Sequence, residues 1–99
     1  MQFLVKAFDG TDEAAPKRRL DAREEHLKST DERVKAGNTI CAAAMLDEEG
    51  KMFGSVLIVD YPSREELDQW LKVEPYMVHN VWQKIEITPC RLAPMFAKK

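Results

Sequence analysis

Two apolar segments in the middle of the chain limit its fold more than any other feature. Thr39–Leu46 and Met52–Tyr61 are separated only by Asp47–Lys51, a polar stretch that contains Gly50. A polar connection of this length with a glycine predicts a β-hairpin. Because both segments carry apolar side chains at odd and at even positions, we expect both faces of this hairpin to be covered.

Ahead of the hairpin, the sequence predicts one strand and one long helix. Gln2–Phe8 has the short apolar alternation of a strand. Proline is tolerated only in the first turn of a helix, so the helix is expected to begin within Ala14–Pro16. We place its end at Ala36, because Gly37 suits the left-handed position that closes many helices.

After the hairpin, the sequence predicts a second helix and a last strand. Ser63 and Glu66 have the spacing of a capping box, which starts a helix. Pro75 disfavours helical conformation at Glu74 and therefore ends it. A short turn follows, and Val81–Thr88 then alternates as a strand with one polar face.

The order strand, helix, strand, strand, helix, strand is that of the ferredoxin-like (βαββαβ) α+β fold. The 99 residues suit a single domain spanning residues 1–99. Right-handed connections place both helices on one face of a four-stranded antiparallel sheet, which leaves the other face uncovered. Because a large open apolar face is unusual in a monomer, we expect a homodimer formed through the open sheet face.

Within the long helix, apolar residues recur every seven positions. Leu20, Leu27 and Val34 form this stripe, with Arg23 and Thr30 in the intervening turns. We expect the stripe to face the core. A neighbouring row on the same helix is cationic, and it consists of Arg19, His26 and Arg33. Cationic groups so close to a core-facing stripe are unusual.

Charge and motifs exclude several classes of function. The net charge is −2 and the only basic cluster is Lys17–Arg19, so nucleic acid is not an expected partner. No apolar run approaches the ~20 residues of a membrane span. Cys41 and Cys90 lack metal-binding spacing and no cofactor motif is present, so we expect neither metal nor cofactor. In the absence of a signal peptide, reduced thiols and a cytoplasmic location are expected.

Several segments together resemble the YciI-like (YCII-related) proteins of the dimeric α+β-barrel group. They are Arg23–Leu27, Gly37, Phe53–Ser55, Ser63–Leu67, Trp70, Glu74–Tyr76 and Thr88–Pro89. The resemblance implies a ferredoxin-like dimer with a pocket between helix and sheet that holds a His–Asp pair. Carried over to this chain, the histidine is His26, and the family's Asp-Pro-Tyr becomes Glu74-Pro75-Tyr76. Since glutamate is one methylene longer, its carboxylate must sit differently to meet the imidazole.

His26 and Glu74 are therefore the candidate catalytic residues. A histidine can take up and return a proton near neutral pH, and a carboxylate on its second nitrogen would hold the tautomer. The alternative is that His26 is a boundary residue with its ring half in water.

Arg23, Ser55 and Tyr76 are the candidate substrate-binding residues. Arg23 could clamp a carboxylate or phenolate, or it could instead form a structural ion pair with Asp60 or Glu74. The Ser55 hydroxyl could hold a ligand oxygen, or it could be satisfied by the backbone. Tyr76, with Trp70 and Trp82, could line an aromatic pocket or belong to an ordinary core.

Two functions from different classes remain open at this stage. The first is a small-molecule enzyme using acid–base chemistry. The resemblance to YciI-like proteins implies a lyase, dehalogenase or isomerase type of reaction on a small aromatic or lactone-type substrate. The second is a non-catalytic ligand-binding or accessory dimeric domain. His26 and Glu74 in hydrogen-bond contact beside a cavity would favour the enzyme, whereas His26 on the surface would favour the binding domain.

Overall fold

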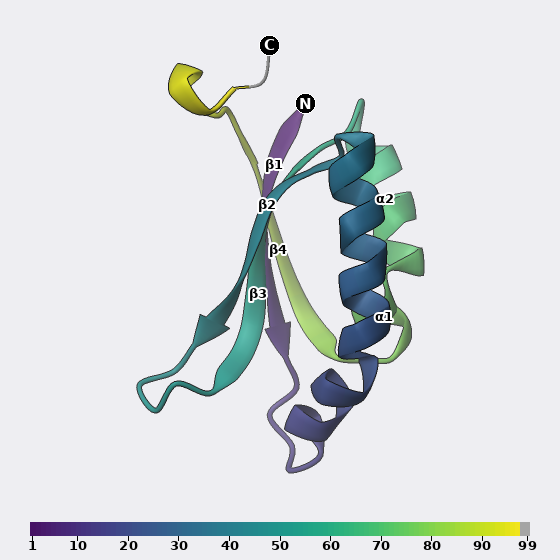
Figure 1. Cartoon of the computed structure of the whole chain (residues 1–99), viewed down its shortest axis with the longest axis vertical. Helices are drawn as coiled ribbons and strands as arrows, with labels where there is room; N and C mark the ends of the chain where they lie inside the picture. Colours follow the sequence, from purple (N-terminus) through teal and green to yellow (C-terminus); the bar gives the residue numbers. More distant parts are fainter. Residues whose placement is uncertain (98–99) are drawn as a thin grey trace.

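The computed structural model describes residues 1–97 and has the predicted order of elements (Figure 1). The elements are β1 (Gln2–Asp9), α1 (Ala15–Ala36), β2 (Thr39–Leu46), β3 (Met52–Asp60), α2 (Arg64–Val73), α3 (Pro75–Val78), β4 (Trp82–Cys90) and the 3₁₀ turn η1 (Pro94–Phe96). The predicted bounds agree to within a few residues. β4 continues through Pro89 to Cys90, beyond the expected end at Thr88, because it is an edge strand and an edge strand tolerates a missing amide donor.

The four strands form one antiparallel sheet in the order β2-β3-β1-β4. Both long helices cover the same face of this sheet (Figure 1). The ferredoxin-like prediction is confirmed. No helix within residues 1–97 is both long and apolar enough to cross a membrane.

Local signals act as expected at the ends of the helices. Gly37 has φ of 87°, and its amide donates to the carbonyls of Arg33 and Val34, which closes α1. The Ser63 hydroxyl accepts from the amide of Glu66 at 3.2 Å and caps α2. These contacts satisfy terminal backbone groups that a helix cannot satisfy internally.

The buried face of α1 differs from the predicted one. Leu20, Leu27 and Val34 were expected in the core, but they are 70%, 47% and 50% exposed. The helix instead buries Ala15, Arg19, Ala22 and His26. Ala22 faces the core, and on either side of it Arg19 binds Asp9 and His26 binds Glu74 in the interior. Because this side of α1 faces the sheet, the stripe of Leu20, Leu27 and Val34 lies at the surface.

The core lies between the helices and one face of the sheet. Phe3, Val5 and Ala7 share one face of β1 and point into the core. The opposite face carries Leu4, Val56 and Ile58, which are only half-buried in one chain. The prediction that both faces of the hairpin are covered is therefore wrong for a single chain: one face of β3 is buried, and β2 is exposed along most of its length.

Candidate active site

His26 and Glu74 are in direct contact in the interior of the protein. The His26 Nδ1 atom lies 2.7 Å from Glu74 Oε2, and the Glu74 side chain is 1% exposed. The sequence places Glu74 there because Pro75 holds it in an extended conformation between α2 and α3. The same Oε2 atom accepts from the amide of Tyr76 at 2.8 Å, so Glu74 caps α3 and holds the imidazole at once. The longer side chain of glutamate thus still reaches the histidine.

This contact defines the orientation of the His26 ring. Nδ1 donates its proton to the carboxylate, which leaves the Nε2 lone pair free to accept a proton. Thr30 Oγ1 lies 3.5 Å from Nε2, which is at the outer limit of a hydrogen bond. The Tyr76 ring stacks on the imidazole at 3.8 Å between centroids, and the Trp82 ring meets it edge-on.

A second buried network lies beside the first, and it centres on Arg19. Its Nη1 atom contacts both carboxylate oxygens of Asp9 at 2.9 and 3.0 Å, and its Nη2 atom donates to Ser55 Oγ at 2.9 Å. The same Oγ atom accepts from Trp82 Nε1 at 3.3 Å. Burial raises the pKa of Asp9, and the Arg19 guanidinium opposes that rise. The guanidinium also lies over the Tyr76 ring, 4.9 Å from its centroid.

Both networks open onto a pocket of about 250 Å³ between α1 and the β2–β3 hairpin. Its polar lining comes from Arg19, Arg23, His26, Thr30, Ser55 and Tyr76, and its apolar lining from Leu27, Ala42, Ala43, Ala44, Met52 and Leu57. At ~30 Å³ for each water molecule, the volume corresponds to about eight waters, which is room for a one-ring compound. The alanines of β2 create this room because their side chains are short.

The pocket is positively charged on its open side. Arg23 lines it and, in the part of the chain that the structure describes, forms no ion pair with a carboxylate. The suggested structural pairing of Arg23 with Asp60 or Glu74 is therefore wrong. Burial raises the pKa of Tyr76 above its ordinary value of 10.0, and the Arg19 and Arg23 charges oppose the rise.

Four of the five residues predicted from the sequence line this pocket, and Glu74 lies directly behind His26. Ser55 is satisfied by side chains rather than by the backbone. The sequence suggested no functional role for Asp9, Arg19 or Thr30. Trp82, considered above for an aromatic pocket, lies behind its wall, where it contacts Ser55 and His26. The cationic row on α1 included Arg19, but nothing in the neighbouring sequence indicates that Arg19 would contact Asp9 and Ser55.

The second histidine gives a useful contrast. His79 Nε2 lies 3.0 Å from Glu25 Oε1, but the two side chains are 49% and 63% exposed. Within residues 1–97, no group of three or more His, Cys, Asp or Glu side chains is arranged to hold a metal ion.

The fold and the pocket define a ferredoxin-like α+β protein with a buried histidine–carboxylate pair beside a small cationic cavity. The chain belongs to the YCII-related domain family, whose sequence model matches residues 1–91. The resemblance to YciI-like proteins is thus confirmed. A comparison with curated proteins finds no match.

Solved structures agree with this assignment of the fold. One is 5-chloro-2-hydroxyhydroquinone dehydrochlorinase from Burkholderia phenoliruptrix AC1100 in complex with 2,5-dihydroxybenzoquinone. It has a TM-score of 0.80 and 19% identity over 96% of this chain and 98% of that chain. An antibiotic biosynthesis monooxygenase has a TM-score of 0.54 and 16% identity over 94% of this chain and 98% of that chain. At these identities the likeness establishes the fold alone.

Proposed function

We propose that the protein is a small-molecule enzyme in which His26 transfers a proton and Glu74 orients it. The observation that carries this proposal is the 2.7 Å contact between the two residues at the wall of the pocket. The carboxylate stabilises the imidazolium that forms when Nε2 accepts a proton. A surface histidine would have neither the buried partner nor the adjacent cavity.

The pocket suits an anionic or phenolic one-ring substrate. Arg23 supplies a planar cationic fork for a carboxylate or phenolate. The Ser55 oxygen already accepts from Arg19 and Trp82, so its own O–H remains available to donate to a substrate oxygen. Tyr76 supplies an aromatic wall. The dehydrochlorinase with the same fold, whose structure contains a dihydroxybenzoquinone, supports a small aromatic compound of this class.

The reaction that fits these groups is elimination or isomerisation by proton transfer. In an elimination, Nε2 takes a proton from the substrate, and the electron pair of that bond moves into the substrate. The leaving group departs as an anion with its own bonding pair, and the imidazolium returns its proton to water. The net change is loss of HX, where X is chloride or another leaving group. Arg23 would stabilise the negative charge during this step.

The test is an activity screen with chlorinated hydroxyhydroquinones, measuring chloride release, and with lactones, measuring isomerisation. We expect His26→Ala to lower turnover by about 10²–10⁴-fold. Arg23→Gln should raise KM, because Arg23 binds the anionic substrate, and should also lower kcat, because Arg23 stabilises the charge formed during the step. The matched control is His79→Ala, which removes the other histidine from a solvent-exposed pair. Binding of these compounds without turnover, unchanged by His26→Ala, would favour a non-catalytic binding domain and refute the enzyme.

We also propose that the chain forms a homodimer through the open sheet face. Leu4, Val56 and Ile58 lie on this face, and the rings of Phe8 and Phe53 stack at 6.5 Å between centroids. Lys6 and Lys84 border the Phe8 ring on the same face, and an apolar patch edged by polar groups is typical of an interface. Val56→Asp should give a monomer in sedimentation, whereas Leu20→Asp on the surface of α1 should leave the dimer intact. A wild-type chain that is monomeric at micromolar concentration would refute this arrangement.

A further inference from the structure

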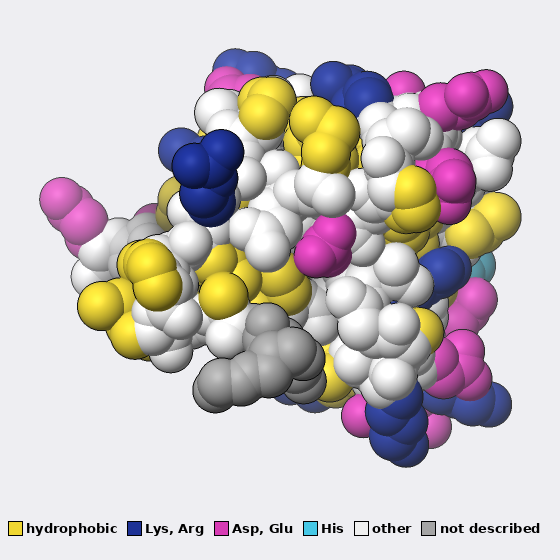
Figure 2. Space-filling view, turned by 90° about the horizontal axis from the view of Figure 1, so that it is seen from above, with side chains coloured by type: hydrophobic (Ala, Val, Ile, Leu, Met, Phe, Trp, Pro, Cys, Tyr) yellow, Lys and Arg dark blue, Asp and Glu magenta, His cyan; other side chains and the backbone are white. Residues whose placement is uncertain are grey.

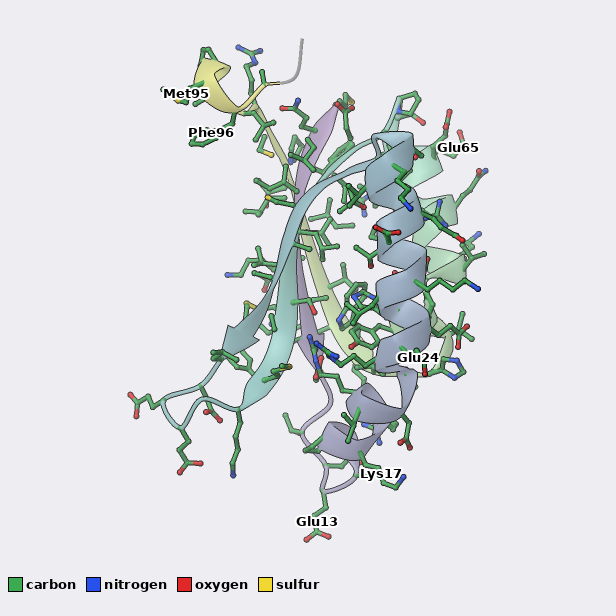
Figure 3. The ribbon with its side chains drawn as sticks, in the orientation of Figure 1. Glu13, Lys17, Glu24, Glu65, Met95 and Phe96 are labelled. Atoms are coloured by element: carbon green, nitrogen blue, oxygen red, sulfur yellow. The ribbon has the colours of Figure 1, made fainter. Side chains whose placement is uncertain are left out.

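The segment that follows β4 extends away from the rest of the chain. Its η1 turn lies on the side of the sheet opposite α1, with Met95 and Phe96 pointing into open space (Figure 3). Met95 is 76% exposed and Phe96 is 68% exposed. Figure 2 looks down on the end where both termini lie, and it shows hydrophobic side chains gathered beside the grey terminal residues. Exposed apolar side chains that gather into one patch are typical of an interaction surface.

This segment has a defined conformation. The Leu92 amide donates to Gln2 Oε1 at 2.8 Å, which anchors its start to β1. Phe96 N–H donates to the carbonyl of Ala93 at 2.9 Å and closes the η1 turn. A turn that is already formed presents its side chains without a further ordering cost, as expected of a preorganised docking segment.

The open face of the sheet contains an apolar hollow of about 300 Å³. Every lining residue is apolar, and they are Leu4, Cys41, Ala42, Ala43, Val56, Leu57 and Ile58. In the register of the sheet, Ala43 pairs with Val56 and Cys41 pairs with Ile58. The short side chains on β2 therefore leave the hollow beside the longer ones on β3. No hydrogen-bonding side chain other than the thiol lines it, so it suits an apolar side chain rather than a polar ligand.

We propose that Met95 and Phe96 of one copy occupy this hollow in a second copy, and that the exchange is reciprocal. The segment leaves from β4, at the opposite edge of the sheet from β2. It is anchored to Gln2, and none of its residues lines the hollow of its own chain. In a face-to-face dimer, the hollow of the second copy faces the segment of the first copy. Two-fold symmetry then places the segment of the second copy against the hollow of the first. This inference rests on the proposed face-to-face dimer, and it adds the part of the chain that fills the hollow.

Disulfide trapping tests the contact, because the native Cys41 lines the hollow and is exposed. The variant is Phe96→Cys in a Cys90→Ser background, oxidised gently and run on a non-reducing gel. We expect a covalent dimer whose peptide map joins Cys41 to the introduced thiol, since a disulfide forms only when the two Cα atoms lie within about 7 Å. The control is Val78→Cys in the same background, a site that is 59% exposed on α3. Cys90→Ser alone tests for pairing between two copies of Cys41, and neither control should cross-link.

The outcomes are distinct. An intramolecular disulfide would mean that the segment fills its own hollow, and it would overturn the proposal. The absence of any disulfide in a sample that sediments as a dimer would refute the docking of the segment while leaving the face-to-face dimer standing. A monomer in the same sedimentation run would refute both. As an independent measure, Met95→Ser with Phe96→Ser should raise the dimer Kd roughly tenfold or more, and an unchanged Kd would overturn the proposal.

Discussion

Removal of the Glu74 carboxylate is the sharpest test of the buried site. Its Oε2 atom accepts from His26 Nδ1 and from the Tyr76 amide, and Glu74→Ala leaves both donors buried without a partner. An unsatisfied buried donor costs about 1–3 kcal/mol, so the free energy of unfolding should fall by roughly 2–6 kcal/mol. In a chain of this size, each 1 kcal/mol lowers Tm by about 4–8 °C.

Glu74→Gln separates the structural role of this side chain from its chemical role. The amide oxygen can take the position of Oε2 and accept from the same two donors, so we expect a loss of only about 1 kcal/mol. The amide carries no charge to stabilise an imidazolium. If His26 transfers the proton, turnover should therefore fall by about 10²–10⁴-fold despite the small change in stability.

The assay is urea unfolding of the wild type and both variants, followed by the activity screen. The matched control is Glu25→Ala, which removes the partner of His79 from a pair of nearly the same length but exposed to solvent. Exposed pairs contribute about 0–1 kcal/mol, so this variant should unfold close to the wild type. If Glu74→Ala and Glu25→Ala lower the free energy of unfolding equally, the reasoning is refuted, because burial of the Glu74–His26 pair would then add nothing to its contribution to stability.

Three further predictions concern other parts of the chain. The hydrogen bonds from Arg18 lower the pKa of Asp12 to about 2. The stabilisation from Asp12 is thus present above its ordinary pKa of 3.8 and is lost as the pH falls through about 2, so Asp12→Asn should lower Tm at pH 5 and match the wild type below pH 2. Burial raises the pKa of both tyrosines, Tyr61 and Tyr76, above 10.0, so phenolate absorbance of the folded protein should titrate above that pH, and a midpoint at 10.0 would contradict their burial. Leu20→Ala should change the free energy of unfolding by no more than about 0.5 kcal/mol, and a loss above about 2 kcal/mol would mean that the stripe on α1 is buried after all.

The ends of the helices could be predicted from the sequence, because they depend on residues that act on their immediate neighbours. Gly37 ends α1, Ser63 starts α2, and Pro75 holds Glu74 out of both helices. Each of these effects depends on the backbone within about one helical turn, so a single sequence contains the information. The alternation of Gln2–Phe8 likewise predicted the strand that is β1.

The buried face of α1 was not predictable in the same way. Periodicity favoured Leu20 and its neighbours every seven residues, whereas the tertiary structure buries Arg19 and His26. A polar side chain can replace an apolar one in the interior only if it finds a partner there. The partner of His26 is Glu74, 48 residues away, and the partners of Arg19 lie on β1 and β3.

The sequence by itself therefore determined the order of the elements, their ends, the ferredoxin-like topology and the family. It also identified the side chains that could do chemistry, including His26 and Glu74. Only the tertiary structure decided which side of α1 faces the sheet and that Arg19, Asp9 and Ser55 form one network. The physical reason is that the free energy of burying a charged group depends on partners brought together by sheet register and helix placement, and these partners are distant in the sequence.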